Sequence, residues 1–162
     1  MKTLLLARHA KSSWNADVAT DFERPLNDRG LRDAPMMAAR LVDRAFTLNE
    51  LVSSTANRAL ATARTFADGL NHRKPITQTG DIYEASSERI LETIAALNDE
   101  RQCVMLVGHN PGMSHTCNLL CSSANIAMPT CAIACLELDI EHWHELCPDC
   151  ATLRWYDYPK KL

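Results

Sequence analysis

The sequence predicts a three-layer α/β/α fold, in which helices cover both faces of a mostly parallel central sheet. Short apolar runs typical of strands alternate along the chain with amphipathic stretches of helical period. The first run, Leu4 to Leu6, is continuously apolar, as expected of a strand that is buried on both faces. No linker, repeat or low-complexity tract interrupts residues 1–162, so we expect one domain with a substantial core.

The first half of the chain is expected to hold three strands and two helices. After the first strand, residues 10–27 are polar and predict a long loop, which Trp14 and Phe22 would hold in place. Asn27 or Asp28 is a suitable N-cap for the next helix, and Pro35 lies near its start. The elements predicted from there are a helix over 28–45, a strand over 48–53, a helix over 56–70 and a strand over 74–79.

The second half continues the alternation and ends in two strands. Ser86 or Ser87 would cap one helix, and Pro111 suits the first turn of another. The predicted elements are a helix over 87–98, a buried strand over 103–107, a helix over 111–122 and strands over 130–138 and 151–158. An excursion over 142–150 separates the last two strands, which we expect to form a hairpin at one end of the sheet.

The composition indicates an ordinary globular protein. Apolar residues make up 46% of the chain and charged residues 23%, and the net charge of -3 does not suggest binding to nucleic acid or membranes. Seven cysteines cannot all pair within one chain. The apolar stretch at Thr3 to Ala7 is also too short for a secretory signal or a membrane span. We therefore expect a cytoplasmic protein whose thiols are reduced.

Basic side chains follow three of the predicted strands. Arg8 and His9 follow the first strand, Arg58 lies in the first turn of the helix after the second, and His109 follows the strand over 103–107. Because parallel strands end at one edge of a sheet, these side chains can converge, together with the N-termini of helices. Such a cationic site suits a phosphoryl group. A neutral imidazole could attack phosphorus while the arginines and a protonated second histidine stabilise the transition state, without a metal or other cofactor.

The motifs at these positions resemble the histidine phosphatase superfamily, also called phosphoglycerate mutase-like. They appear in the family's order and extend over most of the chain. The matching segments are RHA at 8–10, with alanine in place of the family's glycine, RPLNDRG at 24–30, STANRALATA at 54–63 and GHN at 108–110. The resemblance implies the phosphoglycerate mutase-like fold and a phosphatase reaction through a covalent phosphohistidine intermediate.

The resemblance also implies roles for individual residues. His9 would be the nucleophile, and Arg8, Arg58 and His109 would complete the phosphate pocket. Asn15 matches a position at which the family places a phosphate contact. The short chain and the RHAKSSW and RPLNDRG segments are most similar to the SixA-type phosphohistidine phosphatases, which implies a phosphohistidine-bearing signalling protein as the substrate. A phosphatase acting on small phosphomonoesters is the alternative within the family.

The general acid is left open by the sequence. Glu84 is the candidate by position, and Asp17, Asp21 and Glu23 in the loop over 10–27 are weaker candidates. A phosphohistidine leaves as an imidazole, which is a better leaving group than an alkoxide. An enzyme acting on phosphohistidine therefore does not need a strong acid.

Two further hypotheses come from other classes of protein. A non-catalytic phosphate-binding domain would keep a cationic pocket, but the presence of all four pocket residues favours an enzyme. The segment His142, His144, Cys147 and Cys150 offers four ligands suited to zinc, whereas the alternative is an exposed turn before the last strand. A redox role for this C-x-x-C is disfavoured because thioredoxin-like motifs open a helix.

Overall fold

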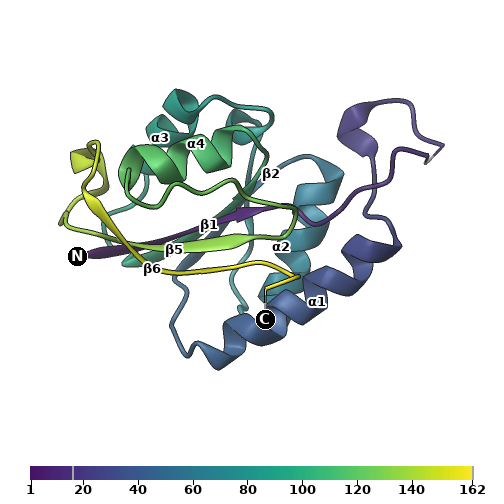
Figure 1. Cartoon of the computed structure of the whole chain (residues 1–162), viewed down its shortest axis with the longest axis horizontal. Helices are drawn as coiled ribbons and strands as arrows, with labels where there is room; N and C mark the ends of the chain where they lie inside the picture. The colour runs from purple at the N-terminus through teal and green to yellow at the C-terminus, as the bar shows by residue number, and fades with distance from the viewer. Residues whose placement is uncertain (16, 162) are drawn as a thin grey trace.

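A six-stranded sheet with the order β3-β2-β4-β1-β5-β6 forms the centre of the computed structural model, which describes residues 1–15 and 17–161 (Figure 1). Helices α1 and α2 cover one face of the sheet, and α3 and α4 cover the other. The predicted three-layer fold is therefore confirmed. Ala16 in the predicted loop and Leu162 at the end of the predicted domain lie outside the described residues.

The strands are parallel except at one end of the sheet. β1 lies parallel to β4 on one side and antiparallel to β5 on the other, while β2 lies parallel to both β3 and β4. β5 and β6 form the predicted hairpin. The strands are β1 (Lys2–Arg8), β2 (Glu50–Ser54), β3 (Thr77–Thr79), β4 (Cys103–Gly108), β5 (Ile133–Leu138) and β6 (Ala151–Asp157).

The helices match the predicted ones but are shorter at one or both ends. They are α1 (Asp28–Asp43), α2 (Asn57–Gly69), α3 (Ser87–Ala95) and α4 (Gly112–Leu120), with short 3-10 helices η1 (Asp21–Glu23), η2 (Gly80–Ile82) and η3 (Trp143–Glu145). Asn27 caps α1 and Ser86 caps α3. Pro111 is the N-cap of α4 rather than part of its first turn. Pro35 lies well inside α1, where it is exposed, so water can satisfy the carbonyl that loses its partner.

The strand β1 packs on both helical layers at once. Leu4 and Leu6 belong to the apolar cluster under α3 and α4, whereas Leu5 and Ala7 belong to the cluster under α1 and α2. All four side chains are fully buried. Each leucine contributes about 1.5–3 kcal/mol by leaving water. The continuous apolar run thus fixes β1 in the middle of the sheet, and with it the position of the residues that follow Ala7.

The loop over residues 10–27 is organised by a buried arginine. Arg24 is 8% exposed, and its guanidinium lies 3.3 Å from the centre of the Trp14 ring. Trp14 is itself 75% exposed, so its contact within the loop is with Arg24 and not with the core. Phe22 is 39% exposed and contacts the Tyr83 ring edge to face. The guanidinium donates hydrogen bonds to the carbonyl of Ser13, the hydroxyl of Ser12 and the carboxylate of Asp21.

The start of α1 lies directly against this loop. The backbone N–H of Asn27 donates to the carbonyl of Lys11 over 3.0 Å, and the Asn27 side chain accepts from the N–H of Gly30 over 2.9 Å. A Cβ atom on Gly30 would lie 2.1 Å from the same Lys11 carbonyl oxygen. The glycine of the RPLNDRG segment is therefore required by a close approach of backbone to backbone.

Within the described residues, no helix is both long enough and apolar enough to cross a membrane.

Candidate active site

The four residues predicted to form the phosphate pocket lie around one cavity of about 270 Å³. Arg8 is the last residue of β1 and His9 follows it, His109 follows β4, and Arg58 lies in the first turn of α2. β1 and β4 are neighbours, so His9 and His109 approach each other with their ring centres 5.1 Å apart. The cavity is also lined by Lys11, Ser12, Trp14, Asp21, Arg24, Glu84, Asn110 and Thr130.

His9 is held as a neutral imidazole with a free lone pair. Its Nδ1 lies 2.7 Å from the carbonyl oxygen of Ala10, which can only accept, so Nδ1 carries the ring proton and Nε2 does not. Burial lowers the pKa of His9 to about 3, and the positive charges of Arg58 and Arg8 lower it as well. At neutral pH the Nε2 atom is therefore available as a nucleophile.

With no anion bound, His109 is also neutral, whereas the protonated second histidine is expected in the transition state. Burial lowers its pKa to about 4, and the charge of Arg58 acts in the same direction. Its Nε2 lies 2.8 Å from the hydroxyl of Ser54, whereas no described residue bonds its buried Nδ1. If Ser54 donates to Nε2, the Nδ1–H is left for an anion. A bound phosphoryl dianion would favour the protonated ring, so His109 can gain its charge when substrate binds.

The two arginines supply the donors of the pocket. Arg58 is 4% exposed, and its two terminal nitrogens donate to the carbonyl and the carboxylate of Asp21 over 2.8 and 3.0 Å. Arg8 donates one bond to the carbonyl of Met128, and its buried Nε atom has no partner among the described residues. Burial lowers the pKa of Arg8. Two guanidinium groups with unused donors suit the oxygens of a phosphoryl group.

Thr62 connects the segment that carries His9 with the helix turn that carries Arg58. Its hydroxyl accepts from the backbone N–H of Ala10 over 2.9 Å and donates to the carbonyl of Arg58 over 2.8 Å. The residue is fully buried. The end of β1 and the first turn of α2 are thereby tied together beside the nucleophile. Thr62 lies within the STANRALATA segment, but the sequence analysis did not predict its role.

Asp21 brings a negative charge into the pocket. Its carboxylate accepts from Arg24 over 2.8 Å, from the Tyr83 hydroxyl over 2.7 Å and from Arg58 over 3.0 Å. Burial alone would raise the pKa of Asp21, but these hydrogen bonds outweigh it and lower the pKa below its ordinary value. Asp21 is therefore ionised at neutral pH and is unsuited to donate a proton.

Tyr83 completes this network and was missed by the sequence reasoning. Burial and the hydrogen bond to Asp21 raise the pKa of Tyr83. Its ring meets the His109 ring edge to face, with centres 5.4 Å apart. Tyr83 is only one residue before the predicted Glu84, but nothing in its local sequence distinguishes it from a surface tyrosine.

Among the candidates for a general acid, Glu84 differs from Asp17 and Glu23 because it lines the cavity. Glu84 lines the cavity with an exposed side chain and has a φ of 49°, in the left-handed region that a non-glycine residue adopts at a cost. Asp17 is exposed, and the carboxylate of Glu23 accepts from the Thr20 hydroxyl instead. Of the described acidic residues, only Asp21 and Glu84 line the cavity.

Asn15 is not placed at the pocket. It is exposed, its backbone N–H donates to the hydroxyl of Ser13 over 3.2 Å, and it is absent from the described residues that line the cavity. The amide that does line it belongs to Asn110, whose side chain bonds the carbonyl of Met128. Asn15 therefore does not line the cavity, and the phosphate contact expected of it stays a prediction.

The segment from His142 to Cys150, considered above as a zinc site, does not bring its four candidate ligands together. The rings of His142 and His144 are stacked, with centres 5.4 Å apart, and Nδ1 of His142 lies 3.2 Å from the carboxylate of Asp99. Within residues 1–15 and 17–161, no group of three or more histidines, cysteines and acidic residues is arranged to hold a metal ion. Cys147 and Cys150 belong to an exposed turn before β6.

Comparison with known proteins identifies relatives over nearly the whole chain. Residues 4–88 match the model of the histidine phosphatase superfamily (branch 1). An uncharacterized protein of Mycobacterium tuberculosis is 31% identical over 164 residues, which cover 94% of this chain and 99% of that protein. An uncharacterized chloroplastic protein of Arabidopsis thaliana is 28% identical over 153 residues, which cover 89% of this chain and 70% of that protein.

Solved structures show the same fold. The crystal structure of a candidate phosphohistidine phosphatase, SixA of Agrobacterium tumefaciens, is 32% identical and superposes with a TM-score of 0.81 over 98% of both chains. The structure of the protein histidine phosphatase SixA in complex with tungstate is 23% identical, with a TM-score of 0.82 over 97% of both chains. The second match supports the fold alone.

Proposed function

Because the chain belongs to the histidine phosphatase superfamily, which supports phosphatase activity, we propose that it hydrolyses phosphohistidine on a partner protein through a covalent intermediate on His9. One observation carries this proposal. The Nδ1–H of His9 is bonded to the carbonyl of Ala10, which leaves the Nε2 lone pair in a cavity shared with two arginines and a second histidine.

The first step transfers the phosphoryl group to His9. Arg8, Arg58 and the Nδ1–H of His109 bind its oxygens, and Nε2 of His9 attacks phosphorus as the P–N bond to the substrate imidazole breaks. The substrate ring carries a proton on its other nitrogen and therefore leaves as a neutral imidazole. The phosphorylated ring keeps its Nδ1 proton and is therefore positively charged. The carbonyl of Ala10 stabilises that charge, and a cationic ring is a good leaving group for the second step. Water then attacks phosphorus, releases phosphate and restores the neutral His9.

Two features favour phosphohistidine as the substrate. Asp21 is ionised and cannot protonate a leaving group, whereas an imidazole leaves without strong acid assistance. The likeness to the Agrobacterium SixA, at 32% identity over nearly the whole chain, points to the same class of substrate. Glu84 lines the cavity and could protonate an alkoxide, so a small phosphomonoester is the second candidate.

The proposal is tested with a phosphohistidine-bearing protein and an alkyl phosphate as parallel substrates. We expect faster turnover of the phosphohistidine. We also expect a labelled phosphoenzyme that is labile in acid and stable in base and is lost in His9→Ala. A phosphoenzyme that persists in His9→Ala would show that the nucleophile is another residue.

Glu84→Gln distinguishes the two substrate classes. We expect this variant to keep its rate on phosphohistidine and to lose roughly tenfold or more on an alkyl phosphate, because an alkoxide gains more from a proton donor. Gln preserves the shape of the side chain, and Glu88→Gln, an exposed change on α3, serves as the control. Equal losses on both substrates would contradict the leaving-group argument.

A further inference from the structure

The segment between β5 and β6 carries two thiols that the proposed phosphatase reaction does not use. Cys147 is exposed and Cys150 is half-buried. The other five cysteines are buried: Cys103, Cys117, Cys121, Cys131 and Cys135. Burial raises the pKa of four of these five to about 11 or 12, so they are poorly reactive. A thiol reagent in solution therefore reaches the pair outside the core first.

Residues 147–150 form a hydrogen-bonded β-turn. The backbone N–H of Cys150 donates to the carbonyl of Cys147 over 3.3 Å, and Asp149 has a φ of 58°. A proline followed by a residue with positive φ is typical of the two central positions of a type II turn. The first and fourth Cα atoms of a β-turn lie within about 7 Å, and disulfides span about 4.4–6.8 Å between Cα atoms. Cys147 and Cys150 occupy these two positions.

The end of α4 and the residues that follow it hold this turn in place. The backbone N–H of Asp149 donates to the carbonyl of Leu119 over 3.1 Å, and its carboxylate accepts from the N–H of Ser122 over 2.7 Å. Both bonds stabilise the positive φ at Asp149. Burial raises the pKa of the Cys150 thiol, and the neighbouring Cys147 thiol raises it further. A fixed turn keeps one thiol at high effective concentration beside the other.

Although this C-x-x-C lies in a turn and does not open a helix, we propose that Cys147 and Cys150 form a redox-active dithiol that closes to a disulfide by exchange with a small-molecule disulfide. The exposed Cys147 gives up its proton and attacks one sulfur of the small disulfide, whose S–S bond breaks to release one small thiol. Cys150 then gives up its proton and attacks the Cys147 sulfur, which releases the second small thiol. The two protein thiols lose two electrons and two protons, and the small disulfide is reduced to two thiols.

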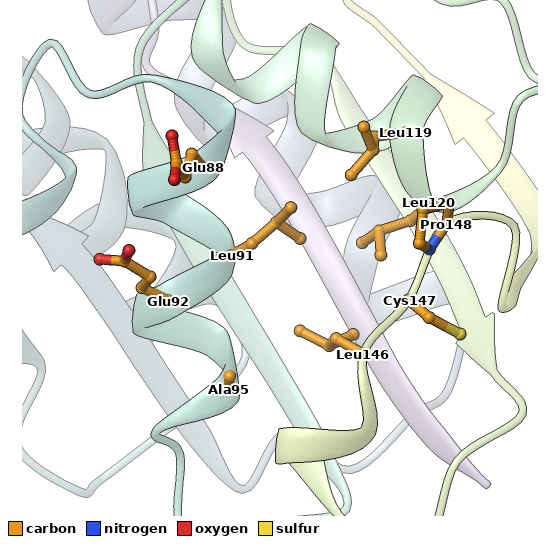
Figure 2. Close-up of a pocket in the computed structure, with 9 residues that line it drawn as sticks. All are labelled: Glu88, Leu91, Glu92, Ala95, Leu119, Leu120, Leu146, Cys147 and Pro148. Atoms are coloured by element: carbon orange, nitrogen blue, oxygen red, sulfur yellow. The ribbon is translucent and has the colours of Figure 1, made fainter.

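Oxidation of this pair would change one wall of a neighbouring apolar groove. Leu146, Cys147 and Pro148 line a groove of about 300 Å³ whose other walls belong to α3 and α4. Figure 2 shows Cys147 at the edge of this groove, with its sulfur directed away from α3. A disulfide to Cys150 would fix the backbone of that wall. None of the described residues that line this groove also lines the phosphate cavity.

The test is oxidation of the full chain in mixtures of reduced and oxidised glutathione, followed by acid quenching, alkylation and peptide mass spectrometry. We expect the wild type to lose two hydrogens in the peptide that holds both cysteines. Cys150→Ser should stop at a glutathione adduct on Cys147, and Cys147→Ser should give neither product. Cys121→Ser, a nearby buried cysteine, is the matched control and should give the wild-type product.

A second variant tests the turn itself. Asp149→Ala removes the bond from Ser122, so we expect the glutathione adduct on Cys147 to form at the wild-type rate but to close more slowly. Circular dichroism establishes that each variant is folded. The proposal is overturned if the wild type stops at the adduct or if Cys147 pairs with a cysteine other than Cys150. An unchanged closing rate in Asp149→Ala would also overturn the assigned role of the turn.

Discussion

Two pairs of histidines with nearly the same spacing have very different surroundings in this protein. The ring centres lie 5.1 Å apart in the pair His9 and His109, and 5.4 Å apart in the pair His142 and His144. The first pair is less than a tenth exposed, between two arginines, at the ends of parallel strands. The second lies on the surface beside the carboxylate of Asp99.

The difference shows what makes a histidine pair chemically useful. Burial and fixed partners determine the tautomer of His9 and keep the ring uncharged, so that Nε2 is a nucleophile at neutral pH. His142 and His144 are both exposed to solvent, and His142 contacts the carboxylate of Asp99. Residue type and spacing are similar in the two places, but the surrounding fold differs.

The largest expected difference is in catalysis. His9→Ala should lower kcat by roughly 10⁴-fold or more, because it removes the nucleophile. His142→Ala should leave kcat within about twofold of the wild type, as expected of an exposed residue outside the cavity. Steady-state kinetics on one phosphorylated substrate measure both. Comparable losses would erase the distinction between the two pairs.

The next largest effect is expected from changing an arginine that lines the cavity with the buried histidine pair. Arg58→Lys keeps the positive charge but loses the forked donors, and should lower kcat/KM by roughly 10²-fold or more. Arg64→Lys, an exposed change on the same helix, is the control and should have little effect. If Arg58→Lys is as active as Arg64→Lys, charge alone accounts for phosphate binding.

Thr62→Val tests whether the buried pair depends on being held by the backbone. The change keeps the volume but leaves the N–H of Ala10 without its partner, which should cost roughly 1–3 kcal/mol of unfolding free energy. It should also lower kcat, because His9 and Arg58 lose their common support. Thr65→Val removes a bond to the carbonyl of Ala61 in the same helix and is the matched control. Urea unfolding and kinetics measure the two effects; unchanged kcat in a destabilised variant would limit Thr62 to a structural role.

The last prediction concerns the dependence of stability on pH. The folded-state pKa values of His9 and His109 lie below the ordinary value of 6.5, so the unfolded chain binds more protons once the pH falls below that value. Stability is therefore complete above about pH 6.5 and decreases as the pH falls towards the folded values, by up to about 1.4 kcal/mol per pH unit for each group. The lowered pKa of Asp21 reduces the stability only when the pH falls below about its ordinary value of 3.8, where the unfolded chain binds more protons.

Urea unfolding between pH 7 and pH 5 measures this dependence. His109→Asn should reduce the slope, whereas His115→Asn, an exposed change on α4, should leave it unchanged. A slope that is the same in wild type and His109→Asn would mean that His109 titrates normally in the folded protein.

The sequence by itself determined the order of the strands and helices along the chain and the four residues that meet at the cavity. Apolar periodicity and N-caps such as Asn27 and Ser86 are local signals, so they could be read without knowing the fold. The position of Arg8 and His9 directly after a continuous apolar run indicated the edge of a buried sheet. The exact ends of the elements were less well determined, as in the case of β3, which is limited to Thr77–Thr79.

The tertiary structure decided the partners and the charge states. Placing β4 between β1 and β2 brings His109 beside His9, and the contact of Asp21 with Tyr83 joins residues 62 positions apart. The neutral state of His109 follows from its burial, which no local pattern contains. Likewise, only the folded chain shows that Cys147 and Cys150 are the first and fourth residues of a hydrogen-bonded turn. Pairing and desolvation depend on segments that are distant in sequence, and they therefore emerge only when the chain is folded.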